Sequence, residues 1–207
     1  MKRTLPARTN RSTQHWMLEL QQAGAGGGPE TVLTATALTA VRRTTWSGSD
    51  VPMPDVPPPE VKQRDILPMA PMAWCRRYEV QPVCGGLPGV WDGRENTNGP
   101  DLASLSRFWM RDQPPRPLDF CSLAALADVF YPRVFLRRTL RVPAGTVSMT
   151  VYFHARAETL QHCGSDFVLG QARGQVYGDG FFDQTAQLWS QAGVPLVTST
   201  QIVYYKE

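Results

Sequence analysis

The sequence is poor in the residues that bind metal ions. Its 207 residues include three histidines and four cysteines, and Cys75, Cys84, Cys121 and Cys163 form no Cys-x-x-Cys pair. Zinc sites need closely spaced thiolates and imidazoles, so we expect no metal site, and nothing else in the sequence indicates a cofactor. The four cysteines are expected to be free thiols in a reducing, cytoplasmic compartment.

Long hydrophobic runs and a strong net charge are also absent. No apolar run approaches the roughly 20 residues of a membrane-spanning helix, and no apolar stretch follows the basic N-terminal residues as in a secretory signal. The net charge of +3 is too small to indicate nucleic-acid binding. Hydrophobic content of 42% and charged content of 19% are typical of a globular protein. We therefore expect neither a membrane nor a nucleic acid as partner.

A proline-rich segment divides the chain. Residues 51–59 contain five prolines, which exclude a helix or a central strand because proline lacks the amide hydrogen and fixes φ. Residues 51–64 are therefore predicted to be an extended connector. Before it, residues 1–50 predict two strands, 12–22 and 31–44, with an irregular lead-in and no helix. Two or three strands are marginal as an independent domain, so this part should pack against something else.

Residues 65–207 predict one helix and a long antiparallel sheet. The helix, 118–134, has Leu123, Ala127, Phe130 and Val134 at the spacing of one apolar stripe. The predicted strands are 74–83, 105–112, 146–154, 167–177, 181–189 and 196–205. A sheet with one helix must bury the helix stripe against one face. This pattern predicts an α+β hotdog fold, a sheet wrapped around one long helix, with one complete unit at 65–207 and a partial unit at 1–50.

Polar residues on two of the strands have ordinary structural explanations. Alternation along 146–154 places Val147 and Met149 on one face and Thr146 and His154 on the other. His154 could be a general base, but it shares a face with other polar residues and is interpreted as structural. Asp183 and Gln184 are interpreted as polar residues of a strand face or of a subunit contact.

Between Phe108 and Gln201 the sequence resembles acyl-CoA thioesterase II and related thioesterase-like proteins. The motifs that carry the resemblance are Trp109-Met-Arg111, Ala-Asp128, Thr146 to Phe153-His154, and Thr198-Ser-Thr-Gln201, in the family's order and approximate spacing. The family's chain looks like two hotdog units in tandem. Residues 1–50 resemble only the later strands of its first unit, ending at the connector Pro58-Pro59-Glu60. The N-terminal part of the first unit is therefore expected to be missing.

The resemblance implies an enzyme that hydrolyses an acyl-CoA to the free acid and CoA. Its catalytic residues would be Asp128, Thr146 and Gln201, which together position one water molecule. A thioester is electrophilic enough for direct attack by water, so a carboxylate can accept the proton while a hydroxyl and an amide fix the orientation of the water. Hotdog units are paired, so the resemblance also implies a homo-oligomer, a dimer or higher.

Two other functions remain open from the sequence. A non-catalytic hotdog module that binds acyl thioesters or serves in assembly is favoured by the missing helix of the first unit. A hotdog hydratase or dehydratase would need a His-Asp pair such as His154 and Asp128, but the helix lacks the motif of that class.

Overall fold

The computed structural model describes residues 2–60, 72–96 and 104–207, which form two compact units, Met1–Gly48 and Ser49–Glu207. The last residues of the predicted connector, 61–64, and the first residues of the predicted complete hotdog unit, 65–71, lie outside the described residues. The sequence-based domain boundaries therefore stay a proposal.

The first unit is a three-stranded antiparallel sheet. Its strands are β1 (Lys2–Thr9), β2 (Thr13–Ala23) and β3 (Pro29–Ala40), in the order β1-β2-β3. The two predicted strands correspond to β2 and β3, and the lead-in forms β1, which was not predicted. β3 ends at Ala40 rather than at residue 44 because its partner β2 begins at Thr13, opposite Ala40. No described residue of this unit is buried, so it has no hydrophobic core of its own.

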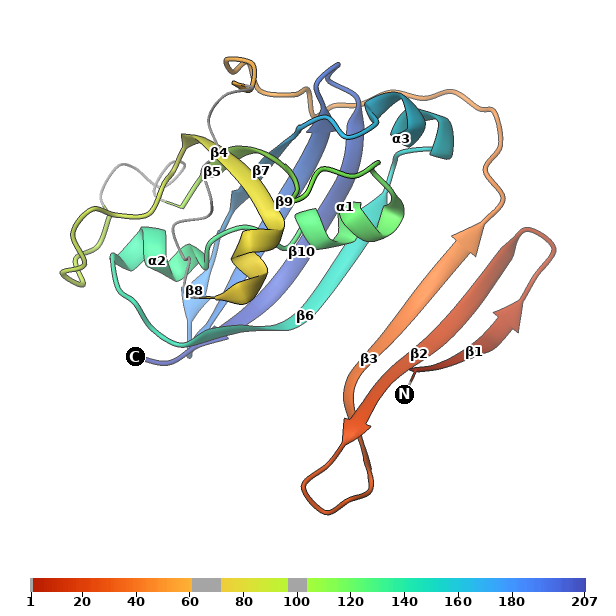
Figure 1. Ribbon diagram of the computed structural model, residues 1–207, viewed down its shortest axis with the longest axis horizontal. Coiled ribbons are helices and arrows are strands. Elements are labelled where there is room, and N and C mark those ends of the chain that lie inside the picture. The colour runs from red at the N-terminus through yellow and green to blue at the C-terminus, as the bar shows by residue number, and fades with distance from the viewer. Residues whose placement is uncertain (1, 61–71, 97–103) are drawn as a thin grey trace. The chain divides into compact units, whose positions relative to one another are not determined.

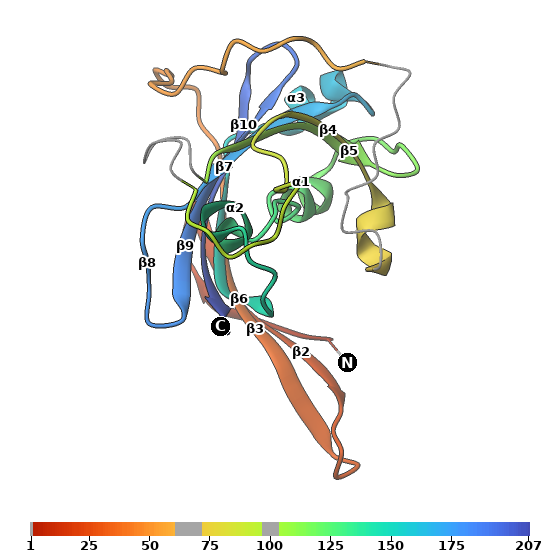
Figure 2. The ribbon, with the colours of Figure 1, turned by 90° about the vertical axis from the view of Figure 1, so that its left-hand side faces the viewer.

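The second unit is a seven-stranded antiparallel sheet with short helices on its concave side (Figures 1 and 2). The strands are β4 (Tyr78–Cys84), β5 (Ser106–Asp112), β6 (Ala144–Phe153), β7 (Val168–Arg173), β8 (Tyr177–Gly178), β9 (Phe181–Ser190) and β10 (Pro195–Tyr205). The helices are η1 (Ala73–Arg77), α1 (Phe120–Leu126), α2 (Arg133–Arg138) and α3 (Ala157–Cys163). Six strands follow the order β4-β5-β7-β9-β10-β6, and β8 pairs with β9.

The predicted helix 118–134 is wrong as a single element. Asp119 begins α1 by accepting a hydrogen bond from the Ser122 amide at 2.6 Å, but α1 ends at Leu126 and α2 begins only at Arg133. The physical reason is Pro132, which has no amide hydrogen to continue the helix and disfavours helical geometry in the residue before it. The helical stripe nevertheless predicted burial correctly, since all four of its residues are buried.

Three further segments differ from the sequence-based expectation. The segment expected as strand 74–83 starts as the 3-10 helix η1, and the strand begins only at Tyr78. Helix α3, after β6, was not predicted. The expected strand 167–177 is two strands, β7 and β8, separated by a short loop.

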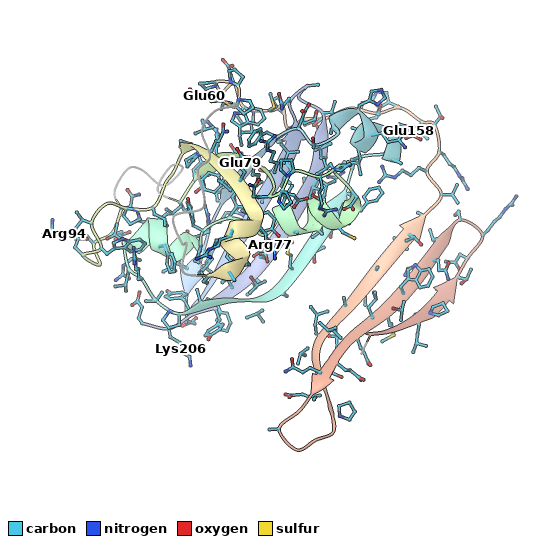
Figure 3. The ribbon with its side chains drawn as sticks, in the orientation of Figure 1. Glu60, Arg77, Glu79, Arg94, Glu158 and Lys206 are labelled. Atoms are coloured by element: carbon cyan, nitrogen blue, oxygen red, sulfur yellow. The ribbon has the colours of Figure 1, made fainter. Side chains whose placement is uncertain are left out.

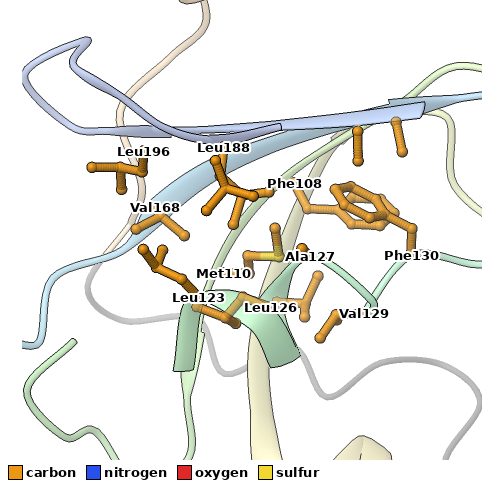
Figure 4. Close-up of a cluster of buried hydrophobic side chains, with 14 of the residues drawn as sticks. Phe108, Met110, Leu123, Leu126, Ala127, Val129, Phe130, Val168, Leu188 and Leu196 are labelled. Carbon is orange, nitrogen blue, oxygen red and sulfur yellow. The ribbon is translucent and has the colours of Figure 1, made fainter. Parts of the chain in front are cut away.

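The main core lies between α1 and the inner face of the sheet (Figure 4). Leu123, Leu126 and Ala127 come from the helix side and are fully buried. They meet Phe108, Met110, Val168, Leu188 and Leu196 from four strands. The alternation of apolar residues along β9 and β10 builds this inner face, and the core fixes where the segment after α1 lies.

The proline-rich segment packs onto the second unit instead of extending into solvent. Its carbonyl groups accept hydrogen bonds from two buried tryptophans, Trp109 to Pro57 at 2.8 Å and Trp189 to Val51 at 3.3 Å. Met53 packs against the same tryptophan cluster. An extended segment without internal hydrogen bonds offers its carbonyl groups to such donors, so this part of the predicted connector belongs structurally to the second unit.

Candidate functional site

A pocket of about 430 Å³ lies in the second unit, between the sheet and the turn that joins α1 to α2. Residues of β6, β9 and β10 form one wall, and the segment Asp128–Pro132 forms the opposite wall. Its polar lining comes mainly from Asp128, Thr146, Gln184 and Gln201, and much of the rest is apolar. A concave, mostly apolar pocket with a few convergent polar groups has the usual form of a ligand site.

The three residues expected to be catalytic lie together in this pocket. The Gln201 side chain stands between the other two: its Nε2 donates to Asp128 Oδ1 at 2.8 Å, and its Oε1 accepts from Thr146 Oγ1 at 3.4 Å. Gln201 Nε2 also lies 3.5 Å from Met149 Sδ. Residues separated by up to 73 positions in the chain are thus joined by one carboxamide.

Asp128 is positioned by the turn after α1 and not by the helix itself. The Asp128 amide donates to the Ala125 carbonyl at 3.0 Å, which closes the last helical turn. Beyond it, the Tyr131 carbonyl accepts a hydrogen bond from Arg133 Nε at 2.9 Å. The fully buried guanidinium of Arg133 also donates to the Ser104 carbonyl at 2.8 Å. Arg133 therefore ties the turn that carries Asp128 to the chain at the start of β5.

Thr146 reaches the pocket through a bulge in β6. Gln201 pairs with Met149 and Ile202 with Ser148, but Val203 then pairs with Thr146, so Val147 has no partner. An extra residue in one strand reverses the alternation beyond it. Thr146 therefore shares the inner face with Met149, and Val147 is 60% exposed. The strict alternation expected from the sequence, with Thr146 on the face opposite Met149, is wrong at this point.

The pocket changes the proton affinity of Asp128. The side chain meets solvent at the open pocket, but the surrounding protein atoms desolvate its carboxyl group, and this burial raises its pKa. The hydrogen bond from Gln201 favours the ionised form and opposes part of the shift. A carboxylate with a raised pKa is a stronger base than a carboxylate with the ordinary pKa of an aspartate, as a general base requires.

Charged groups other than Asp128 are absent from the described lining of the pocket. Among the labelled charged residues, Arg94 and Lys206 lie toward one end of the second unit and Glu158 toward the other (Figure 3).

Within the ranges that the structure describes, no group of three or more His, Cys, Asp or Glu could hold a metal ion. No helix in those ranges is long and apolar enough to cross a membrane.

The structure also places three polar residues that the sequence analysis interpreted as structural, His154, Asp183 and Gln184. His154 lies outside the described pocket lining, and its Nε2 is 3.0 Å from Thr198 Oγ1, in line with a structural role. Asp183 accepts hydrogen bonds from the Gln175 and Val176 amides at 2.9 and 2.7 Å and so fixes the loop before β8. Gln184 is buried and lines the pocket.

The sequence-based interpretation missed the position of Gln184. A signal was present, because Gln184 lies on the same face of β9 as three apolar residues at intervals of two. These residues, Phe182, Ala186 and Leu188, are all buried. Strand periodicity places residues separated by two positions on the same face. A glutamine in such an inward series indicates a pocket or a buried polar contact.

Comparison with known proteins gives a consistent picture. A family model described as acyl-CoA thioesterase C-terminal domain matches residues 49–205. A conserved protein with a hot dog fold from Alicyclobacillus acidocaldarius is 43% identical, with a TM-score of 0.85 over 100% of this chain and 72% of that chain. An acyl-CoA thioesterase II from Mycobacterium marinum is 15% identical, with a TM-score of 0.69 over 99% and 73% of the two chains. A comparison with curated proteins gives no match. The predicted hotdog fold is confirmed.

Proposed function

The chain belongs to the family of the acyl-CoA thioesterase C-terminal domain, and we propose that it hydrolyses an acyl-CoA to the free acid and CoA. The observation that carries the proposal is the hydrogen-bonded trio in the pocket, with Gln201 between Asp128 and Thr146. A carboxylate, an amide and a hydroxyl that converge on one open space can hold a water molecule in a fixed orientation.

The proposed reaction needs no covalent intermediate with the protein. Asp128 takes a proton from the bound water while the water oxygen forms a bond to the thioester carbonyl carbon and the carbonyl electron pair moves to its oxygen. The tetrahedral species then collapses, the carbon–sulfur bond breaks, and the CoA sulfur takes the proton that Asp128 held. Thr146 and Gln201 orient the water but do not take its proton. General-base assistance of this kind contributes about 10²–10⁴-fold.

The apolar part of the pocket fits the acyl part of such a substrate. It is lined by the uncharged side chains of Phe135, Phe182, Val142 and Val203. Such side chains can pack against a hydrocarbon chain. Burial of a methylene group contributes about 0.8 kcal/mol. The acyl chain is therefore expected to lie against these residues, with the thioester carbonyl carbon near the trio.

A CoA-release assay tests the proposal. The purified protein is incubated with acyl-CoAs of several chain lengths, and the free thiol of CoA is measured with a thiol reagent.

The second candidate, a module that binds acyl thioesters without hydrolysis, is favoured by the first unit, in which no described residue is buried. That candidate requires binding of acyl-CoA with no CoA release. A hydratase has no support, because His154 lies outside the described pocket lining.

We also propose that the protein is a homo-oligomer. In the first unit Met17, Leu33 and Leu38 are 56, 52 and 60% exposed, and a small sheet without a core needs cover for such side chains. A second copy of the chain would supply that cover. Light scattering at micromolar concentration is expected to give at least the mass of a dimer, and a monomer mass would contradict the proposal.

A cytoplasmic location is a further proposal, and it rests on the four cysteines, which are all free. Free thiols persist in reducing compartments. Fractionation of cells that express the protein would test it, and recovery in a secreted fraction would contradict it.

A further inference from the structure

Gln184 is a buried polar side chain that the trio does not use. It is 4% exposed and lines the pocket. Gln201 is hydrogen-bonded to both Asp128 and Thr146, whereas no hydrogen bond joins the Gln184 side chain to another residue in the described part of the chain. The Gln184 amide is not among the fully buried side-chain atoms without a partner in the described chain, so it is open to the pocket that the residue lines. A ligand bound in the pocket can therefore supply a hydrogen-bond partner for this amide.

The position of Gln184 relative to the trio is set by strand pairing. On neighbouring strands β9 and β10, Gln184 lies directly opposite Gln201, and both side chains are buried on the inner face. Opposite residues of an antiparallel pair have Cβ atoms about 4.5–5.5 Å apart. A water held by Gln201 would lie about 3–3.5 Å from the carbonyl carbon that it attacks. The carbonyl oxygen of a bound thioester therefore falls within reach of Gln184.

The charges in the pocket indicate that the thioester carbonyl oxygen needs a neutral hydrogen-bond donor. Attack by water places negative charge on the carbonyl oxygen, and the nearby Asp128 carboxylate does not stabilise that charge while it remains ionised. No lysine, arginine or histidine is present in the described lining. A neutral N–H donor is therefore needed, and removal of one such donor from an enzyme typically lowers kcat by about 10²–10³-fold.

We propose that Gln184 is an oxyanion donor, whose side-chain amide hydrogen-bonds the thioester carbonyl oxygen and stabilises the charge that develops on it. The inference rests on the proposed thioester hydrolysis and adds a fourth catalytic residue to the trio. The carboxamide can rotate to present its NH₂ group, and the water attack described above supplies the electron pair that this group stabilises. In the free enzyme the amide has no hydrogen-bond partner among the residues that the structure describes.

Replacing Gln184 by methionine tests the assignment, because methionine keeps the length of the side chain but removes both the donor and the acceptor. The variant Q184M should lose about 10²–10³-fold in kcat with little change in KM. Its melting temperature should stay close to that of the wild type, because the Gln184 side chain makes no hydrogen bond to another described residue that the substitution would remove. A structural role predicts the reverse, a lower melting temperature with kcat largely kept.

Gln187 provides the matched control, since it lies on the same strand, three positions further and on the opposite face, where its Oε1 accepts from Gln171 at 3.4 Å. Q187M should keep the wild-type kcat. If Q184M fails to fold, Q184N retains an amide but withdraws it by one methylene, and it should also lose kcat. An unchanged kcat would overturn the proposal. A loss of kcat confined to acyl-CoAs with a hydroxyl or oxo group on the third carbon would also overturn it, because Gln184 would then bind that substituent and not the thioester carbonyl oxygen.

Binding without turnover separates this proposal from the proposed function. The probes are a ketone analogue of an acyl-CoA, with a methylene in place of the sulfur, and an alkyl-CoA thioether that has no carbonyl group. By calorimetry the wild type should bind the ketone about tenfold more tightly, as one hydrogen bond allows, and Q184M should bind both equally. If the wild type releases no CoA but shows this preference, hydrolysis fails and the Gln184 contact stands. If the wild type binds the two probes equally, the Gln184 contact is overturned whether or not CoA is released.

Discussion

Replacing Asp128 by asparagine is expected to lower turnover by about 10²–10⁴-fold while the protein keeps its fold. Asparagine is nearly isosteric, and its side-chain oxygen can still accept the hydrogen bond that Gln201 Nε2 donates to Asp128 at 2.8 Å. It cannot take a proton from water at neutral pH. The loss should therefore appear in kcat and in kcat/KM, with acyl-CoA binding largely kept.

The pH profile gives a second readout of the same prediction. Burial raises the pKa of Asp128, and the reaction needs the ionised carboxylate. Activity should be present above that raised pKa and should fall as the pH drops through it, at a higher pH than for an ordinary aspartate. The residual activity of D128N should lack this acid limb.

Asp166 supplies the control for the Asp128 variant, because it is exposed and lies outside the described pocket lining. D166N should match the wild type in rate and in pH profile. Rates are compared on proteins whose melting curves coincide. A D128N variant with the wild-type rate would exclude Asp128 as the base.

The second large effect concerns stability. Replacing Phe130 by alanine is expected to lower the free energy of unfolding by about 3–5 kcal/mol. Phe130 is 6% exposed, and its ring stacks on Phe108 with 5.6 Å between centroids. A Cβ at position 170 would lie 2.8 Å from the Phe130 ring, so Gly170 lets the ring approach the β7 backbone closely. Truncation would leave a cavity at a place that is otherwise closely packed.

Denaturant melts measure this loss, and Phe181 on β9 is a suitable control. Phe181 is 47% exposed, so F181A should change the free energy of unfolding by about 0.5 kcal/mol or less. A loss below about 0.5 kcal/mol for F130A would show that the segment after α1 is not part of the core.

The sequence predicted the strands of the second unit better than its helices. The buried residues Ala186 and Leu188 alternate with the polar residues Thr185 and Gln187 along β9, and that period of two comes directly from strand geometry. The helical stripe through Phe130 and Val134 predicted burial, although the chain is not helical between Leu126 and Arg133. Burial depends on which face meets the core, whereas helix continuity depends on backbone amides, and Pro132 decided the latter.

The grouping of Asp128, Thr146 and Gln201 came from a resemblance, because no local pattern predicts it. Their meeting depends on a turn held by a buried arginine and on a bulge at Val147. The bulge leaves the sequence alternation intact, so it becomes visible only when β6 is paired with β10. Register between strands is a tertiary property, set by the packing of one face.

The measurement that tests the central claim most directly is CoA release by the wild-type protein from a series of acyl-CoAs of increasing chain length. If Asp128, Thr146 and Gln201 hold a water for attack on a thioester, free CoA should appear in proportion to enzyme concentration with at least one member of the series. The acyl product should be the free acid. A folded protein that binds these acyl-CoAs and releases no CoA from any of them would contradict the account.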